Sequence, residues 1–278
     1  MSARFRTSDG LSLAFDDRGA GPALLCLAGL TRNMADFEPV VARFAGEARV
    51  IRLDARGRGL SDHDPDWRNY NLVREGRDAL ELLDHLGLAR ASILGTSRGG
   101  LIALTLGLDS AERLAGAMLV DIGPRIEPEA LSQIVGMLGA RPPFRSYEDA
   151  ADRLPDAMAP GFSDVPRATW RAHAERVWRE GPDGLELRYD PRLRDAALEA
   201  SAADAAPDLW PLFDALRDMP VGLIRGANSE LLSAETAGEM RRRRPDMIFA
   251  EVPGRGHVPF LDEPESVAAL SAFLERVA

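Results

Sequence analysis

The chain has 278 residues, with 34 Lys or Arg against 44 Asp or Glu, so its formal net charge is −10. This negative balance repels nucleic-acid phosphates and anionic lipids, and we expect neither nucleic acid nor a membrane as a partner. A single cysteine, Cys26, excludes an internal disulfide framework. The N-terminus lacks the apolar run of a secretory signal, so we expect a cytoplasmic protein.

The first 124 residues alternate short apolar runs with longer helical patterns. Asp9-Gly10 separates two strand-like runs, which predicts an opening hairpin over residues 4–15. The alternation that follows indicates a mostly parallel sheet flanked by helices, an α/β fold. The predicted strands are 23–27, 50–53, 91–94 and 117–120, and the predicted helices are 34–44, 71–86 and 98–108.

Residues 125–211 show helical patterns and hardly any strand signal. The alternation resumes with strands at 221–224 and 247–252 and helices at 234–243 and from about 265. A helical insertion in a resumed α/β pattern predicts a cap laid over a sheet. We therefore expect a core of residues 1–124 and 212–278 and an all-helical cap of residues 125–211.

Residues 95–99 read G-T-S-R-G and lie between a predicted strand and a predicted helix. G-x-S-x-G in this context is typical of a strained turn that exposes a nucleophilic serine, here Ser97. Its glycines let the strand and the helix approach closely. The helix N-terminus also offers unpaired N–H groups to an oxyanion. We expect the oxyanion donors to be the backbone N–H groups of Arg98 and of Leu30, in the loop after strand 23–27.

A serine hydroxyl is a poor nucleophile unless a base removes its proton. Among the four histidines, His257 alone follows the last predicted strand. Ligands meet a parallel sheet in such loops, so His257 is the predicted general base. The chain order serine, acid, histidine favours Glu230, after strand 221–224, as the carboxylate that orients it. Asp121, at the end of strand 117–120, is the alternative acid.

Two further segments carry a resemblance to a known family. Residues 54–62, D-A-R-G-R-G-L-S-D, resemble the D-x-R-G-x-G-x-S-D segment of the capped α/β-hydrolase superfamily, and residues 256–264 resemble its histidine loop. The resemblance runs end to end and implies an eight-stranded sheet with a helical cap after the sixth strand. Serine at position 97 argues against haloalkane dehalogenases and soluble epoxide hydrolases, which carry Asp there. Two positions depart from the family: Ala28 replaces the usual His of the oxyanion loop, and Glu230 replaces the usual Asp.

Together these residues predict a serine hydrolase of esterase or lactonase type. It would cleave a small-molecule carboxylic ester or lactone through an acyl-enzyme intermediate, with a Ser-Glu-His triad and without a metal or cofactor. A carbon–carbon bond hydrolase of ring-cleavage products, using the same residues, stays open as an alternative. So does a non-catalytic ligand receptor, because a fold does not fix a function.

Overall fold

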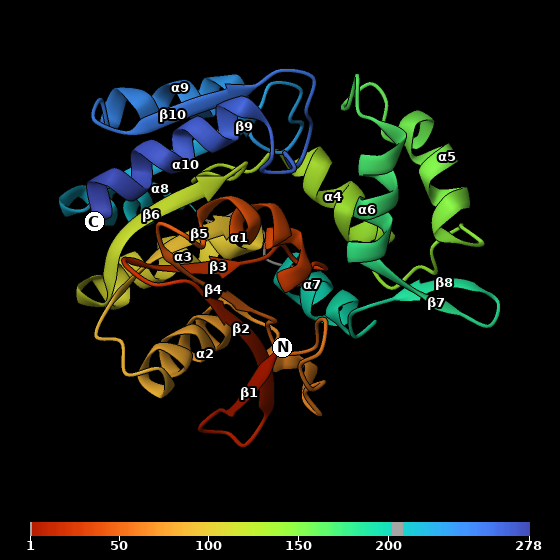
Figure 1. The fold of residues 1–278 in the computed structure, drawn as a ribbon, viewed down its shortest axis with the longest axis horizontal. Coiled ribbons are helices and arrows are strands. Elements are labelled where there is room, and N and C mark those ends of the chain that lie inside the picture. Colours follow the sequence, from red (N-terminus) through yellow and green to blue (C-terminus); the bar gives the residue numbers. More distant parts are fainter. Residues whose placement is uncertain (1, 202–207) are drawn as a thin grey trace.

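The computed structural model describes residues 2–201 and 208–278. An eight-stranded sheet in the order β1-β2-β4-β3-β5-β6-β9-β10 forms its centre (Figure 1). β2 is antiparallel to both of its neighbours, and every other pair is parallel, which confirms the predicted mostly parallel sheet. The strands are β1 (Ala3–Arg6), β2 (Ser12–Arg18), β3 (Ala23–Leu27), β4 (Arg49–Leu53), β5 (Ala91–Thr96), β6 (Leu114–Val120), β9 (Val221–Gly226) and β10 (Ile248–Val252).

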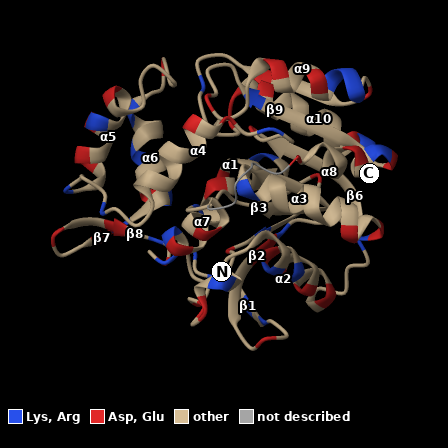
Figure 2. Ribbon diagram, turned by 180° about the vertical axis from the view of Figure 1, so that it is seen from behind, with Lys and Arg blue, Asp and Glu red and all other residues tan. Residues whose placement is uncertain are grey.

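Helices cover both faces of this sheet, and its central strands are therefore apolar on both sides. One face packs against α1 (Glu38–Phe44) and α10 (Pro264–Val277). The other face packs against α2 (Leu72–His85), α3 (Arg98–Asp109), α8 (Trp210–Asp214) and α9 (Ala234–Arg243). Charged residues occur on the outer helices and the loops, for example the three arginines in the last turn of α9 (Figure 2).

Residues 125–211, here called the inserted segment, lie between β6 and β9 and project to one side of the sheet (Figure 1). Residues 202–207 of this predicted cap range lie outside the described residues. Its described helices are α4 (Pro128–Met137), α5 (Tyr147–Ala157), α6 (Arg167–Val177) and α7 (Leu193–Ser201), and the start of α8 also falls in it.

The prediction that this segment is all-helical was wrong. β7 (Trp178–Gly181) and β8 (Gly184–Leu187) form an antiparallel hairpin after α6. Pro182-Asp183 makes the two-residue turn, and Gly184 follows it with φ +116°, a conformation that favours glycine. Leu185 is fully buried in the core of the inserted segment, which fixes the register of the hairpin.

None of the helices in the described ranges is both long and apolar enough to cross a membrane.

Candidate active site

Ser97 lies in the turn between β5 and α3, with φ +50° and ψ −113°. A positive φ is unfavourable for a residue with a side chain, so the surrounding contacts must enforce it. The Ser97 N–H donates to the carbonyl of Val120 at 2.9 Å, and the Ser97 carbonyl accepts from Gly100 and Leu101 at 2.9 and 3.2 Å. The backbone on both sides of Ser97 is therefore held, and the serine occupies the strained turn that the motif predicts.

The glycines around Ser97 allow this close packing of strand and helix. A Cβ at Gly99 would lie 2.0 Å from the carbonyl oxygen of Leu27, and one at Gly95 would lie 2.5 Å from the nitrogen of Gly100. Real side chains do not fit at such distances. The two glycines of the motif thus fix where the Ser97 side chain leaves the sheet.

Three side chains form a continuous hydrogen-bonded chain at the carboxyl edge of the sheet. Ser97 Oγ lies 3.0 Å from His257 Nε2, and His257 Nδ1 lies 2.8 Å from Asp121 Oδ2. With its proton on Nδ1 donated to the carboxylate, the imidazole presents the Nε2 lone pair to the serine hydroxyl. This arrangement can remove a proton from Ser97.

Asp121 is fully buried and directly follows β6. Besides its bond to His257, its Oδ1 accepts from the N–H of Gly226 at 2.8 Å, and its Oδ2 accepts from the hydroxyl of Ser229 at 2.5 Å. Its backbone also has a positive φ of 53°. The neighbouring strand β9 and the loop after it therefore hold this carboxylate in position.

The preference for Glu230 over Asp121 is corrected by this geometry. The loop after β9 turns Ser229 inward, toward Asp121, so the next side chain along the chain, Glu230, points outward and is exposed. The imidazole hydrogen-bonds to the carboxylate at the end of β6 instead. The sequence carried one signal for this outcome: Asp121 directly follows a buried strand that pairs with the strand of Ser97.

The residues expected to bind the oxyanion lie beside Ser97. Arg98 is the first residue of α3, a position whose N–H has no acceptor within its own helix. A Cβ at Gly29 would lie 3.7 Å from the Cβ of Ser97, so the loop that contains Leu30 passes next to the nucleophile. The assignment of these two N–H groups as donors stays a prediction.

The inserted segment reaches the same loop through α6. The Arg32 Nη1 atom lies 3.4 Å from His173 Nε2, and the Asn33 side chain donates to the carbonyl of Arg176 at 2.7 Å. Burial lowers the pKa of His173 well below its usual value, and the nearby charges of Arg32 and Arg176 lower it further. His173 is therefore neutral and can accept a hydrogen bond from Arg32.

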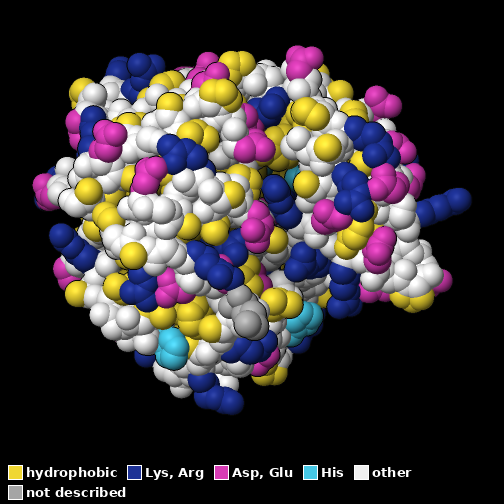
Figure 3. Space-filling view, in the orientation of Figure 1, with side chains coloured by type: hydrophobic (Ala, Val, Ile, Leu, Met, Phe, Trp, Pro, Cys, Tyr) yellow, Lys and Arg dark blue, Asp and Glu magenta, His cyan; other side chains and the backbone are white. Residues whose placement is uncertain are grey.

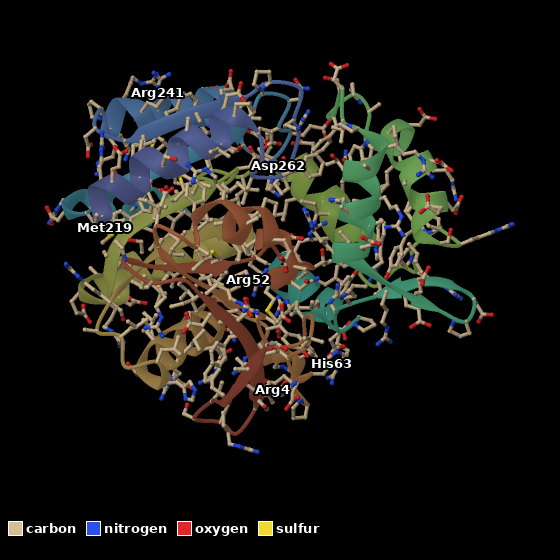
Figure 4. The ribbon with its side chains drawn as sticks, viewed as in Figure 1. Arg4, Arg52, His63, Met219, Arg241 and Asp262 are labelled. Carbon is tan, nitrogen blue, oxygen red and sulfur yellow. The ribbon has the colours of Figure 1, made fainter. Side chains whose placement is uncertain are left out.

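The space-filling view shows a hollow between the inserted segment and the core, with Lys or Arg side chains along it (Figure 3). Asp262, in the loop between β10 and α10, lies near the same junction (Figure 4). His63 lies at the surface below the inserted segment, with 59% of its side chain exposed (Figure 4). Neither Asp262 nor His63 is hydrogen-bonded to Ser97 or His257.

Within the described part of the chain, no group of three or more His, Cys, Asp or Glu residues could hold a metal ion.

Residues 24–270 match the model of the alpha/beta hydrolase family, and the chain therefore belongs to this family. The match confirms the predicted fold and the resemblance to this superfamily. Because the family and the named relatives are hydrolases, the chain is a hydrolase in this broad sense.

Three relatives illustrate the similarity. A 3-hydroxybutyrate-oligomer hydrolase of Cupriavidus necator is 34% identical over 258 residues, which cover 90% of this chain and 87% of the relative. A 2-(acetamidomethylene)succinate hydrolase of Mesorhizobium japonicum is 29% identical, over 95% of this chain and 92% of the relative. The crystal structure of an alpha/beta hydrolase from Novosphingobium aromaticivorans is 37% identical, with a TM-score of 0.91, covering 99% of this chain and 98% of that one.

Proposed function

We propose that the protein is a serine hydrolase that cleaves carboxylic ester bonds in small molecules through an acyl-enzyme intermediate. One observation carries this proposal: the hydrogen-bonded chain from Ser97 through His257 to buried Asp121, with heavy-atom distances of 3.0 and 2.8 Å. The nucleophile, the base and the orienting carboxylate stand in the order that acyl transfer requires.

In the first half of the reaction, Ser97 Oγ attacks the ester carbonyl carbon while its proton passes to His257 Nε2. The carbonyl π electrons move to the oxygen, and the backbone N–H groups of Leu30 and Arg98 bind this oxyanion. The oxyanion then re-forms the carbonyl, the bond to the alkoxy group breaks, and His257 gives its proton to the departing alcohol.

In the second half, water replaces the alcohol. His257 takes a proton from the water as its oxygen attacks the acyl carbon. The second tetrahedral intermediate collapses, the bond to Ser97 Oγ breaks, and the serine recovers its proton from His257. The Asp121 carboxylate holds the imidazole in place and stabilises the imidazolium that forms twice in each cycle.

The choice of an ester substrate is supported by a relative. The Cupriavidus necator protein is named for hydrolysis of 3-hydroxybutyrate oligomers. In an oligomer of a hydroxy acid, carboxylic esters join the units. A serine hydroxyl that a neighbouring histidine deprotonates can attack the carbonyl carbon of such an ester. We extend this bond type, an ester of a short acid, to the present chain.

We further propose that the inserted segment acts as a cap that selects the substrate. Two residues of the oxyanion loop, Arg32 and Asn33, contact α6 of the inserted segment. Phe260 of the histidine loop packs among the aromatic side chains of the same segment. Substrate pockets are commonly lined by apolar side chains with a few polar groups, which this junction offers.

The test is a panel of 4-nitrophenyl esters of increasing acyl length, together with a 3-hydroxybutyrate dimer, a lactone and a chromogenic dienoate. We expect saturable turnover of short-chain esters with no added metal or cofactor. Turnover of the dienoate alone would replace the ester assignment by carbon–carbon bond cleavage. Binding without turnover of any compound would contradict the proposal in favour of a receptor.

A further inference from the structure

Three charged side chains form a buried group behind the nucleophile, here called the Glu75 cluster. Arg58 follows β4, Glu75 lies near the start of α2, and Arg98 is the first residue of α3. The exposed fractions of their side chains are 1%, 2% and 17%. No part of the reaction described above uses these side chains.

Glu75 joins the two arginines through both of its oxygens. Its Oε1 accepts from Arg58 Nη1 at 2.8 Å and from Arg98 Nη2 at 3.0 Å, and its Oε2 accepts from Arg98 Nε at 2.7 Å. Burial alone would raise the pKa of Glu75, but the charges and hydrogen bonds of the two guanidinium groups outweigh burial and lower it. The carboxylate is therefore ionised at neutral pH.

The cluster ends at the two backbone positions expected to bind the oxyanion. At one end, Arg58 Nε donates to the carbonyl of Leu30 at 2.9 Å. At the other end lies Arg98, the residue directly after the nucleophile, whose Nη2 also donates to the carbonyl of Tyr70 at 3.0 Å. An unbroken series of hydrogen bonds thus connects the loop of residues 28–33, here called the Leu30 loop, to the start of α3.

The geometry points to Arg58, Glu75 and the Arg98 side chain as positioning residues that set the separation of the Leu30 and Arg98 N–H groups. The inference rests on the proposed function, because the two N–H groups matter only if an oxyanion forms at Ser97. The three side chains act through the backbone and do not touch the reacting atoms.

The Leu30 loop needs such support because it belongs to neither a helix nor a strand. A hydrogen bond from the Arg32 N–H to the Gly29 carbonyl at 3.1 Å closes its turn, but this bond does not connect the loop to α3. The bond from Arg58 to the Leu30 carbonyl does connect them, through Glu75. An oxyanion donor must lie within hydrogen-bond range of the transition state, and a shift of about 1 Å can cost a hundredfold in rate.

A purely stabilising role explains the cluster less well. Buried ion pairs contribute little stability beyond that of well-packed apolar residues, because both charges lose their hydration. In addition, Arg58 Nη2 is buried and has no hydrogen-bond partner among the described residues, which is itself unfavourable. The cluster therefore adds little to the free energy of unfolding, but its directional hydrogen bonds hold the loop in one position.

The same helix supplies a matched control. Asp78, three residues after Glu75 on α2, is 1% exposed and pairs with buried Arg56 through two hydrogen bonds of 2.7 Å. Arg56 comes from the same loop as Arg58, and its backbone carbonyl accepts from Arg58 Nη1 at 2.6 Å. The hydrogen bonds between the Asp78 and Arg56 side chains themselves reach neither Leu30 nor Arg98. The Asp78–Arg56 pair is therefore a buried carboxylate–guanidinium contact on the same helix whose side chains make no bond to the loop of Leu30 or to Arg98.

The experiment compares Glu75→Gln with Asp78→Asn, using 4-nitrophenyl butyrate turnover and the rate of labelling by a fluorophosphonate, whose phosphoryl oxygen occupies the oxyanion position. Both variants should lower the melting temperature. We expect Glu75→Gln to lower kcat and the labelling rate by about 10- to 100-fold while KM changes by less than about threefold. Asp78→Asn should keep both rates within about threefold at temperatures well below unfolding. Equal losses in the two variants would overturn the inference.

Arg58→Lys covers the case in which Glu75→Gln does not fold. Lysine keeps the positive charge beside Glu75 but lacks the planar fork that donates to Glu75 and to the Leu30 carbonyl at once. We expect a loss of kcat of about tenfold with little change in KM, and unchanged rates would overturn the inference. Failure of the fluorophosphonate to label Ser97 in the wild-type protein would overturn the proposed function and the inference with it. If the wild-type protein is labelled normally but Asp78→Asn loses as much activity as Glu75→Gln, the inference is overturned and the proposed function stands.

Discussion

The carboxyl edge of the sheet and the inserted segment meet beside Ser97, but different interactions build them. At the edge, Ser97 and Asp121 have constrained backbones, and short hydrogen bonds fix the side chains. In the inserted segment, aromatic rings form the core: Trp170 contacts Phe162 and also Phe260 of the histidine loop, each at a centroid distance of 5.5 Å. Constrained backbone and short hydrogen bonds thus fix the reacting groups at the edge, whereas ring packing fixes the neighbouring segment, which also contacts the histidine loop through Phe260.

The largest effect should follow from removing the nucleophile at the sheet edge. Ser97→Ala should lower kcat/KM for 4-nitrophenyl esters by about five orders of magnitude or more, because no acyl-enzyme can form. Thermal melting should be nearly unchanged, since alanine fits the space that serine occupies. Stopped-assay turnover measurements on the purified variant check this, and residual activity within a hundredfold of wild type would point to another nucleophile.

The next effect separates the two carboxylates. Asp121→Asn should lower kcat by about three to four orders of magnitude, because the charge that stabilises the imidazolium disappears. Glu230→Gln should change kcat by less than about twofold, since an exposed side chain with no contact to His257 is lost. Steady-state kinetics of both variants measure the ratio. A larger loss of kcat in Glu230→Gln than in Asp121→Asn would show that Glu230, in the loop after β9, orients His257.

Ser97 and the carboxylate that orients His257 differ in how far the local sequence determines their position. The turn at Ser97 depends on neighbouring residues, so the motif at residues 95–99 correctly predicted its strained backbone, and the role of Ser97 as the nucleophile stays a prediction. The acid depends on which side chain folds inward after two adjacent strands. The inward turn of Ser229 decides that choice, and local sequence does not encode it.

Elsewhere, the order of strands and helices followed from apolar periodicity, and the family match confirmed the fold. The hairpin of β7 and β8 was missed, although Gly181-Pro182-Asp183-Gly184 contains its turn signal. The Glu75 cluster could not be predicted, since its members are separated along the chain and meet only when α2 packs against α3.

Trp170 is the side chain whose loss should destabilise the inserted segment most. Trp170 is 1% exposed and lies in the core of that segment. Trp170→Ala should lower the free energy of unfolding by about 3–5 kcal/mol, through lost burial and the cavity left behind. Below the unfolding transition, fluorophosphonate labelling of Ser97 should stay within about threefold of wild type. Urea denaturation and labelling time courses measure the two quantities, and a hundredfold loss of labelling would show that the core depends on the segment.

The smallest effect should follow from loosening one tether between the two regions. Asn33 accepts a hydrogen bond from the Ala35 N–H and donates to the Arg176 carbonyl. Asn33→Ser keeps a capping oxygen but loses the donor, and the Arg176 carbonyl still accepts from Arg188 at 3.2 Å. We expect a loss of about 1 kcal/mol in unfolding free energy and a change in KM of less than about fivefold, with kcat preserved. Asn33→Ala, which removes the cap as well, serves as the comparison, and a collapse of kcat in Asn33→Ser would contradict the expectation.

If Ser97, His257 and Asp121 act as one unit, a covalent probe of serine hydrolases should modify Ser97 at a rate that depends on Asp121. The protein would be treated with a fluorophosphonate, and the modified residue and its rate of modification would be determined by peptide mass spectrometry. We expect a single adduct on Ser97, absent from Ser97→Ala and formed about a thousandfold more slowly in Asp121→Asn. An adduct on another residue, or equally fast labelling of Ser97 in Asp121→Asn, would contradict this expectation.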